Sequence, residues 1–168
     1  PDEIYICVQS KKMKAKFIIV TLISMVFFSA AAQDITTTRK KNFNLNDDNI
    51  AIRGYDPVAY FKTGSAQKGT RDLALSYQGV VYYFATAENK EEFKKHPSKY
   101  EPEYGGWCAY AMGAKGDKVS IDPGTFKILN GKLYLFYNRN FNNTLKSWNK
   151  DEAGLKGKAD ANWSKTFH

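Results

Sequence analysis

Two short turns between apolar runs constrain the fold of this chain more than any other feature. Asn130-Gly131 is the dipeptide most typical of a tight β-hairpin turn, and Gln78-Gly79 places glycine where a positive φ is needed. Strand-like residues flank each turn: 73–77 and 80–84 around the first, 126–129 and 133–137 around the second. We therefore expect two antiparallel hairpins. In the last strand, residues 133, 135 and 137 should share one face, opposite residues 134 and 136.

Helix signals occur before, between and after these hairpins. Asp56 before Pro57 is typical of a helix start, with Gly64 as the stop. Thr86 should cap a second helix over residues 87–95, which Pro97 ends. Two more helices are expected near residues 141–148 and 151–163. With 168 residues, 43% of them hydrophobic, the chain predicts one small α+β domain, an antiparallel sheet of hairpins packed with short helices.

The N-terminal part has the pattern of an export signal. Residues 13–32 contain lysines, an apolar run over residues 17–28 and small residues before Gln33, as in a cleaved signal peptide. Twelve helical residues rise only about 18 Å, too short for a hydrocarbon core of about 30 Å. Residues 1–12 precede a plausible initiator methionine and are interpreted as an upstream translation artefact. Polar residues 33–49 predict a flexible tether, and the protein is expected to be exported, periplasmic or secreted.

The charge of the chain argues against a nucleic-acid partner. Without residues 1–32, which hold four lysines and two acids, the formal net charge falls from +8 to +6. The remaining basic residues are scattered, whereas nucleic-acid binders usually cluster them on one face. A solvated, mildly basic surface is the better interpretation.

Residues 104–112 hold the strongest candidate for chemistry. Cys108 is the only cysteine after the leader, and Met112 would lie on the same face if this stretch is helical. A thiolate and a thioether are soft ligands that suit Cu(I), and His96 is the one histidine within the domain. The sequence therefore suggests the hypothesis of a copper site formed by Cys108, Met112 and His96. The alternatives are that Cys108 and Met112 are core residues, or that Cys108 has redox or nucleophilic chemistry.

Other catalytic arrangements are not evident. No carboxylate pair, Ser-His-Asp set or phosphate loop is recognisable, so an enzymatic role is not favoured. Gly105-Gly106 suits either a tight turn or converging backbone N–H groups at a helix start. Several tyrosines could line a pocket for an aromatic or planar ligand, although such residues more often form the rim of a small core: Tyr55, Tyr60, Tyr82, Tyr83, Tyr100, Tyr104 and Tyr110.

The order of motifs over residues 50–164 resembles the YHS-domain family, in its exported stand-alone branch. The motifs are Gly54-Tyr55-Asp56-Pro57-Val58-Ala59-Tyr60-Phe61, Tyr82-Tyr83-Phe84-Ala85, His96-Pro97-Ser98-Lys99-Tyr100, Tyr104-Gly105-Gly106-Trp107-Cys108-Ala109, Asp122-Pro123, and Gly131-Lys132-Leu133-Tyr134-Leu135. Better-understood YHS modules are considered heavy-metal-binding through cysteines. At the corresponding positions this chain has Ala59-Tyr60-Phe61 and Ala85, so the resemblance implies the fold without those ligands.

These observations predict an exported YHS-like binding module that holds a soft metal ion, copper, or a small ligand near Cys108. Candidate ligand contacts come from the motifs: Tyr55, Asp56, Tyr104, Gly105, Gly106 and Trp107. The alternatives are a cysteine-dependent redox protein or enzyme, and a non-catalytic docking domain of the cell envelope. No transmembrane segment is expected after signal cleavage, and the sequence does not identify a protein partner.

Overall fold

The computed structural model describes residues 34–167. The chain divides into two compact units, Pro1–Thr36 and Thr37–His168, and the account below concerns the second. The predicted upstream segment 1–12 and signal peptide 13–32 lie outside the described residues. Within the described part of the chain, no helix is both long and apolar enough to cross a membrane.

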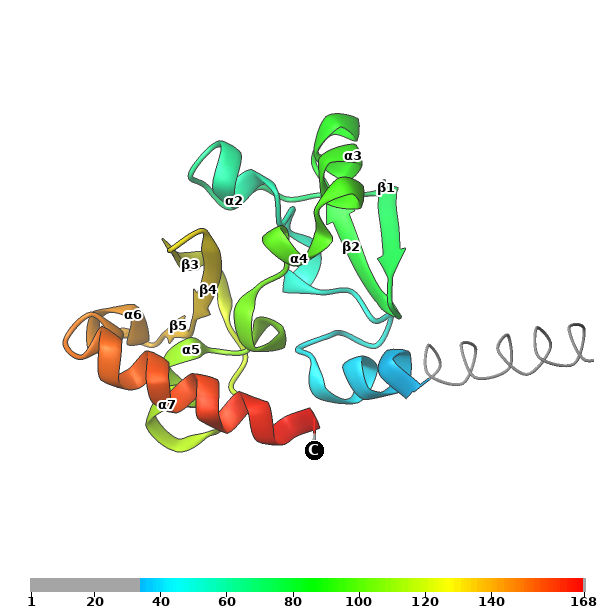
Figure 1. Ribbon diagram of the computed structural model, residues 1–168. Helices are drawn as coiled ribbons and strands as arrows, with labels where there is room; N and C mark the ends of the chain where they lie inside the picture. Colours follow the sequence, from blue (N-terminus) through cyan, green and yellow to red (C-terminus); the bar gives the residue numbers. More distant parts are fainter. Residues whose placement is uncertain (1–33, 168) are drawn as a thin grey trace, which may run out of the picture. The chain divides into compact units, whose positions relative to one another are not determined.

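Both predicted hairpins are present (Figure 1). Strand β1 (Thr70–Tyr77) pairs with β2 (Val80–Phe84), and β3 (Asp122–Leu129) pairs with β4 (Lys132–Phe136). Both residues of each turn have positive φ, 47° and 81° in the first and 51° and 73° in the second, as tight hairpin turns require. A short third pair joins β5 (Asn138–Arg139) to β6 (Asn142–Asn143). The described strands form three separate two-stranded sheets within the predicted α+β fold.

Short helices connect and cover the hairpins. They are α2 (Ala59–Lys62), α3 (Ala87–Lys95), α4 (Pro97–Tyr100), α5 (Ala109–Lys115), α6 (Thr144–Trp148) and α7 (Glu152–Ser164), with 3-10 turns η1 (Ile52–Gly54), η2 (Glu103–Gly106) and η3 (Lys165–Phe167). Thr86 caps α3 as predicted, its side chain accepting from the Asn89 N–H. Helix α6 begins later than predicted, because residues 138–143 form the third hairpin. In Figure 1, α3 lies beside β1 and β2, and α7 runs along α5.

Strand β4 separates two hydrophobic clusters, because both of its faces are buried. Leu133 and Leu135 belong to a first cluster, which also includes Phe93 of α3. Tyr134 and Phe136 point to the other face, as the period of two predicts, and join a second cluster around Trp148. The predicted division of faces is therefore correct, and each face has its own core.

Residues 37–49 are packed against the domain, so the predicted flexible tether over residues 33–49 needs correction. Residues 37–42 are helical, and the buried Arg39 side chain forms an ion pair with Glu101. The Asn44 N–H donates to the Gly105 carbonyl at 2.9 Å. The polar composition of this segment suggested disorder, but its polar groups find partners that are distant in the sequence.

Candidate ligand pocket

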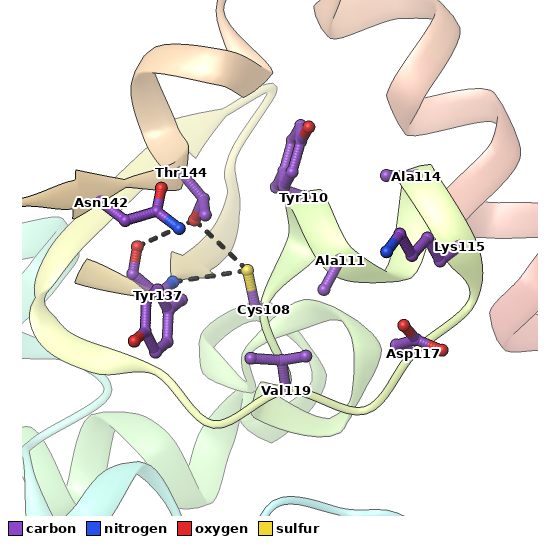
Figure 2. Close-up of a pocket in the computed structure, with 10 residues that line it drawn as sticks. All are labelled: Cys108, Tyr110, Ala111, Ala114, Lys115, Asp117, Val119, Tyr137, Asn142 and Thr144. Atoms are coloured by element: carbon purple, nitrogen blue, oxygen red, sulfur yellow. Dashed lines mark hydrogen bonds between the residues drawn. The ribbon is translucent and has the colours of Figure 1, made fainter. Parts of the chain in front are cut away.

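A pocket of about 320 Å³ lies beside Cys108 (Figure 2). Its wall on the α5 side is formed by Tyr110, Ala111, Ala114 and Lys115, with Asp117 and Val119 of the following loop; Tyr137, Asn142 and Thr144 form the other side. The lining therefore combines small apolar side chains with two aromatic rings and several polar groups. Regular elements carry most of it, since α5 supplies one wall and the β5–β6 region the other.

Backbone contacts fix Cys108 at the base of this pocket. The residue immediately precedes α5 and pairs with Leu135 of β4 in a parallel bridge. Its N–H donates to the Val119 carbonyl at 2.9 Å. The residue is 0% exposed and its thiol is free. Cys108 therefore belongs to the first hydrophobic cluster and also borders the pocket.

The thiol takes part in a closed ring of three hydrogen bonds. The Tyr137 N–H donates to Cys108 Sγ at 3.4 Å, and the Thr144 hydroxyl donates to the Tyr137 carbonyl at 2.9 Å. Thr144 Oγ1 also lies 3.4 Å from Cys108 Sγ. Because a hydroxyl has one proton to donate, and Thr144 gives it to the carbonyl, the thiol proton must point to Thr144. The sulfur of Cys108 thus has two internal hydrogen-bond partners, the Tyr137 N–H and the Thr144 hydroxyl.

Two opposite charges lie on the side of the pocket that faces away from this ring. In Figure 2, Lys115 and Asp117 are on the opposite side from Tyr137 and Asn142. Both charged side chains are exposed, and within the described part of the chain neither has an ion-pair or hydrogen-bond partner. The pocket therefore presents one free cation and one free anion close to an aromatic and apolar surface.

The three predicted copper ligands do not form one cluster, although Cys108 and Met112 are one turn apart at the start of α5. His96 is exposed at the C-terminal end of α3. Met112 is buried in the second cluster, whereas Cys108 lies in the first. Among residues 34–167, no group of three His, Cys, Asp or Glu side chains is arranged to hold a metal ion. The observed arrangement does not fit the predicted copper site, and it agrees with the alternative that Cys108 and Met112 are core residues.

Asp56, a predicted ligand contact, is occupied by internal hydrogen bonds. Its Oδ1 accepts from the N–H groups of Val58 and Ala59 at 2.8 and 3.2 Å. Its Oδ2 accepts from the Ala85 N–H at 2.9 Å and from the Asn89 side chain at 2.7 Å. The residue is 0% exposed, so its carboxylate joins the start of α2 to the end of β2 and to α3. The predicted helix start at Asp56-Pro57 needs correction, because α2 begins at Ala59 with Val58 in the cap position, and Asp56 instead holds the turn before it. A ligand contact would require these bonds to break.

The other predicted contacts also serve internal packing. Tyr104 is buried, and its hydroxyl donates to Asp160 at 2.9 Å. Burial, together with this hydrogen bond, raises the pKa of Tyr104 well above its ordinary value.

Trp107 and Gly105 also contact the N-terminal segment of the domain. Trp107 Nε1 donates to the Asn42 carbonyl at 2.6 Å. A Cβ on Gly105 (φ 58°) would lie 2.8 Å from ring atoms of Phe43.

Two motif residues remain. Tyr55 is half-buried, with Lys68 Nζ 4.7 Å from its ring centre, and Gly106 is buried in η2 with a φ of 81°. Of the predicted metal and motif contacts, only Cys108 is among the residues that line the pocket. Tyr110, one of the tyrosines considered for an aromatic pocket, lines it as well.

The sequence reasoning missed several residues of the pocket, above all Lys115, Asp117, Asn142 and Thr144. A local signal existed for the first two. Gly116 adopts a left-handed conformation (φ 76°) and ends α5, as glycine commonly does after a helix. A helix that starts after Cys108 and ends at this glycine would have placed Lys115 and Asp117 at its C-terminal end. No local pattern in the sequence predicted that residues 137–144 would pack beside Cys108 and form the other wall of the pocket.

Comparison with known proteins relates one segment of the chain to a known domain family. Residues 58–104 match the family model of the YHS domain, which confirms the predicted resemblance over that segment. This segment, less than half of the chain, is thus similar to a YHS domain. No curated protein and no solved structure matched the chain. The matched segment ends four residues before Cys108, so the pocket is formed by residues that follow it.

Proposed function

We propose that this protein is an exported, non-catalytic binding module that holds a small molecule in the pocket beside Cys108. The observation that carries the proposal is the pocket itself. Its volume of about 320 Å³ lies within the usual range of small-molecule sites, and its lining combines apolar surface with a few polar groups. The signal-like pattern of residues 13–32 supports export.

The hydrogen-bond ring around Cys108 favours binding over thiol chemistry. A cysteine nucleophile reacts as the thiolate and usually has a base or a positive charge beside it. Here the thiol proton is directed to Thr144, and the sulfur accepts from the Tyr137 N–H. His96, the histidine that a cysteine nucleophile would need as a base, is exposed at the end of α3.

The groups around the pocket also favour an organic ligand over copper. Cys108 would supply one soft ligand, but Lys115 is a cation and Asp117 offers a hard carboxylate oxygen. Small-molecule sites, in contrast, commonly combine apolar walls with a few charged or hydrogen-bonding groups. We therefore favour a small organic molecule over a metal ion as the ligand of the pocket.

A fragment screen followed by amide NMR of the full chain tests the proposal. Fragments that bind should shift the amide signals of pocket residues such as Ala111 and Asn142. Ala111→Phe should fill the pocket and abolish those shifts, because Ala111 lines it. Ala161→Phe adds the same ring at an exposed position of α7 and should leave binding unchanged. The proposal fails if no fragment shifts the pocket signals, or if Ala111→Phe leaves the shifts intact.

The redox alternative has a separate test. Because Cys108 is 0% exposed, iodoacetamide at neutral pH should label it slowly in the folded chain and fully in urea. Labelling can be followed by intact mass, with a peptide map to distinguish Cys108 from Cys7. Rapid labelling of the folded protein at Cys108 would support the redox alternative instead.

A further inference from the structure

We propose that the pocket selects an aromatic zwitterion, a ligand of the chemical class of the aromatic amino acids. This inference rests on the proposed function and specifies its ligand. It follows from two separate properties of the lining: the aromatic side chains on both sides, and the unpaired opposite charges on one side.

The aromatic property comes from Tyr110 and Tyr137. Both residues line the pocket, Tyr110 at the start of α5 and Tyr137 directly after β4. In Figure 2 the two rings extend in opposite directions, Tyr110 upward and Tyr137 downward. Both side chains are half-buried, so each packs against the core and still contributes surface to the cavity. Ala111, Ala114 and Val119 leave the space between the walls apolar and uncrowded. A flat ring fits this space better than a bulky saturated group, because aromatic faces and edges attract one another.

The charged property comes from Lys115 and Asp117. They flank Gly116, whose left-handed conformation turns the chain between them, and both line the pocket. Neither is paired with the other, nor with another side chain of residues 34–167. A ligand carboxylate can bind the Lys115 ammonium while a ligand ammonium binds the Asp117 carboxylate. A ligand with a single charge would satisfy one side chain and place the other beside a like charge or leave it unpaired.

Four matched probes separate the two properties. Phenylalanine has the ring and both charges, cyclohexylalanine replaces the ring by a saturated one, phenethylamine lacks the carboxylate, and 3-phenylpropionate lacks the ammonium. We expect the full chain to bind phenylalanine most tightly by amide NMR titration. Cyclohexylalanine should bind about 2- to 10-fold more weakly, the range expected of an aromatic contact. Each singly charged probe should bind up to about fivefold more weakly, as for a solvent-exposed ion pair.

Variants assign each charge to its side chain. Lys115→Met should weaken phenylalanine and 3-phenylpropionate but leave phenethylamine unchanged or improved. Asp117→Asn should give the converse pattern. Lys158→Met, at an exposed position of α7, is the matched control and should change none of the four affinities. Tyr110→Leu and Tyr137→Leu retain apolar bulk and should remove the preference for phenylalanine over cyclohexylalanine.

The failures of the two proposals are distinguishable. If the four probes bind equally, or none binds while other fragments still shift the pocket signals, the aromatic zwitterion is wrong and the binding module stands. If Lys115→Met and Asp117→Asn affect all probes alike, the assignment of the charges is wrong. If no fragment shifts the pocket signals at all, the proposed function itself fails.

Discussion

At the residue scale, Asp56 shows how one buried carboxylate holds three elements together. Its four hydrogen bonds all come from donors of the protein, two at the start of α2, one after β2 and one in α3. An ionised carboxylate accepts such bonds strongly, and buried donors that lose their acceptor pay their full desolvation cost. The Asp-Pro motif therefore has a structural explanation that requires no ligand.

Asp56→Ala should lower the free energy of unfolding by about 3 kcal/mol or more, because it leaves several buried donors without an acceptor. Urea unfolding followed by circular dichroism measures this loss. Asp72→Ala, at an exposed position of β1, is the matched control and should change stability by less than about 0.5 kcal/mol. Similar stability of the two variants would contradict the assigned role of Asp56.

At the element scale, the second hairpin depends on its turn. Gly131 has a φ of 73°, and a Cβ placed there would meet no atom within 4 Å. Any cost of adding a methyl group therefore comes from the backbone conformation, with no contribution from crowding. Gly157 of α7 offers the same open space without a positive φ. The two glycines thus allow one substitution to be compared in two backbone conformations.

Gly131→Ala should destabilise the domain by about 1 kcal/mol, because a Cβ is unfavourable in the left-handed region. Gly157→Ala should stabilise it by about 0.5–1 kcal/mol, because alanine loses less conformational entropy in a helix. Thermal and urea unfolding of both variants provide the measurement. Effects of the same sign would mean that the turn does not control the hairpin.

At the scale of the unit formed by residues 37–168, tyrosines buried in both clusters link folding to alkaline pH. Burial is the main cause that raises the pKa of Tyr60, Tyr82 and Tyr104 above the ordinary value of 10.0. Nearby Glu101 adds to the effect at Tyr82, and Asp160 adds to it at Tyr104. In the unfolded chain these groups would lose their protons near about pH 10. Their contribution to stability is fully present below that pH and falls as the pH rises toward the folded values.

Alkaline titration of the folded chain should therefore show the phenolate absorbance of Tyr60, Tyr82 and Tyr104 only when the domain unfolds. This should occur above about pH 10, where the same tyrosines ionise in the unfolded chain. The change in circular dichroism should coincide with this part of the rise in absorbance. The chain in urea is the control and should titrate in one step. Ionisation of Tyr60, Tyr82 and Tyr104 near pH 10 with the fold intact would contradict this prediction.

The local elements were predictable because their signals are short-range. The Asn130-Gly131 and Gln78-Gly79 turns, the Thr86 cap and the Pro97 stop each act within a few residues, and the structure contains each of them. The candidate site was less predictable. Residues 104–108 were interpreted as a place where ligands bind, but most of their side chains serve internal packing.

The sequence by itself determined the hairpins, the alternating faces of β4 and the YHS segment. Turn chemistry, periodicity and motif order depend only on residues that are close together in the sequence. Only the tertiary structure decided that residues 37–49 pack on the domain and that Asp56 joins three elements. It also decided that a pocket forms beside Cys108. These features depend on residues that are distant in the chain, such as Cys108 and Tyr137, which lie 29 positions apart. Tertiary packing determines which groups are buried and hydrogen-bonded at such contacts, and a local sequence pattern does not predict that packing.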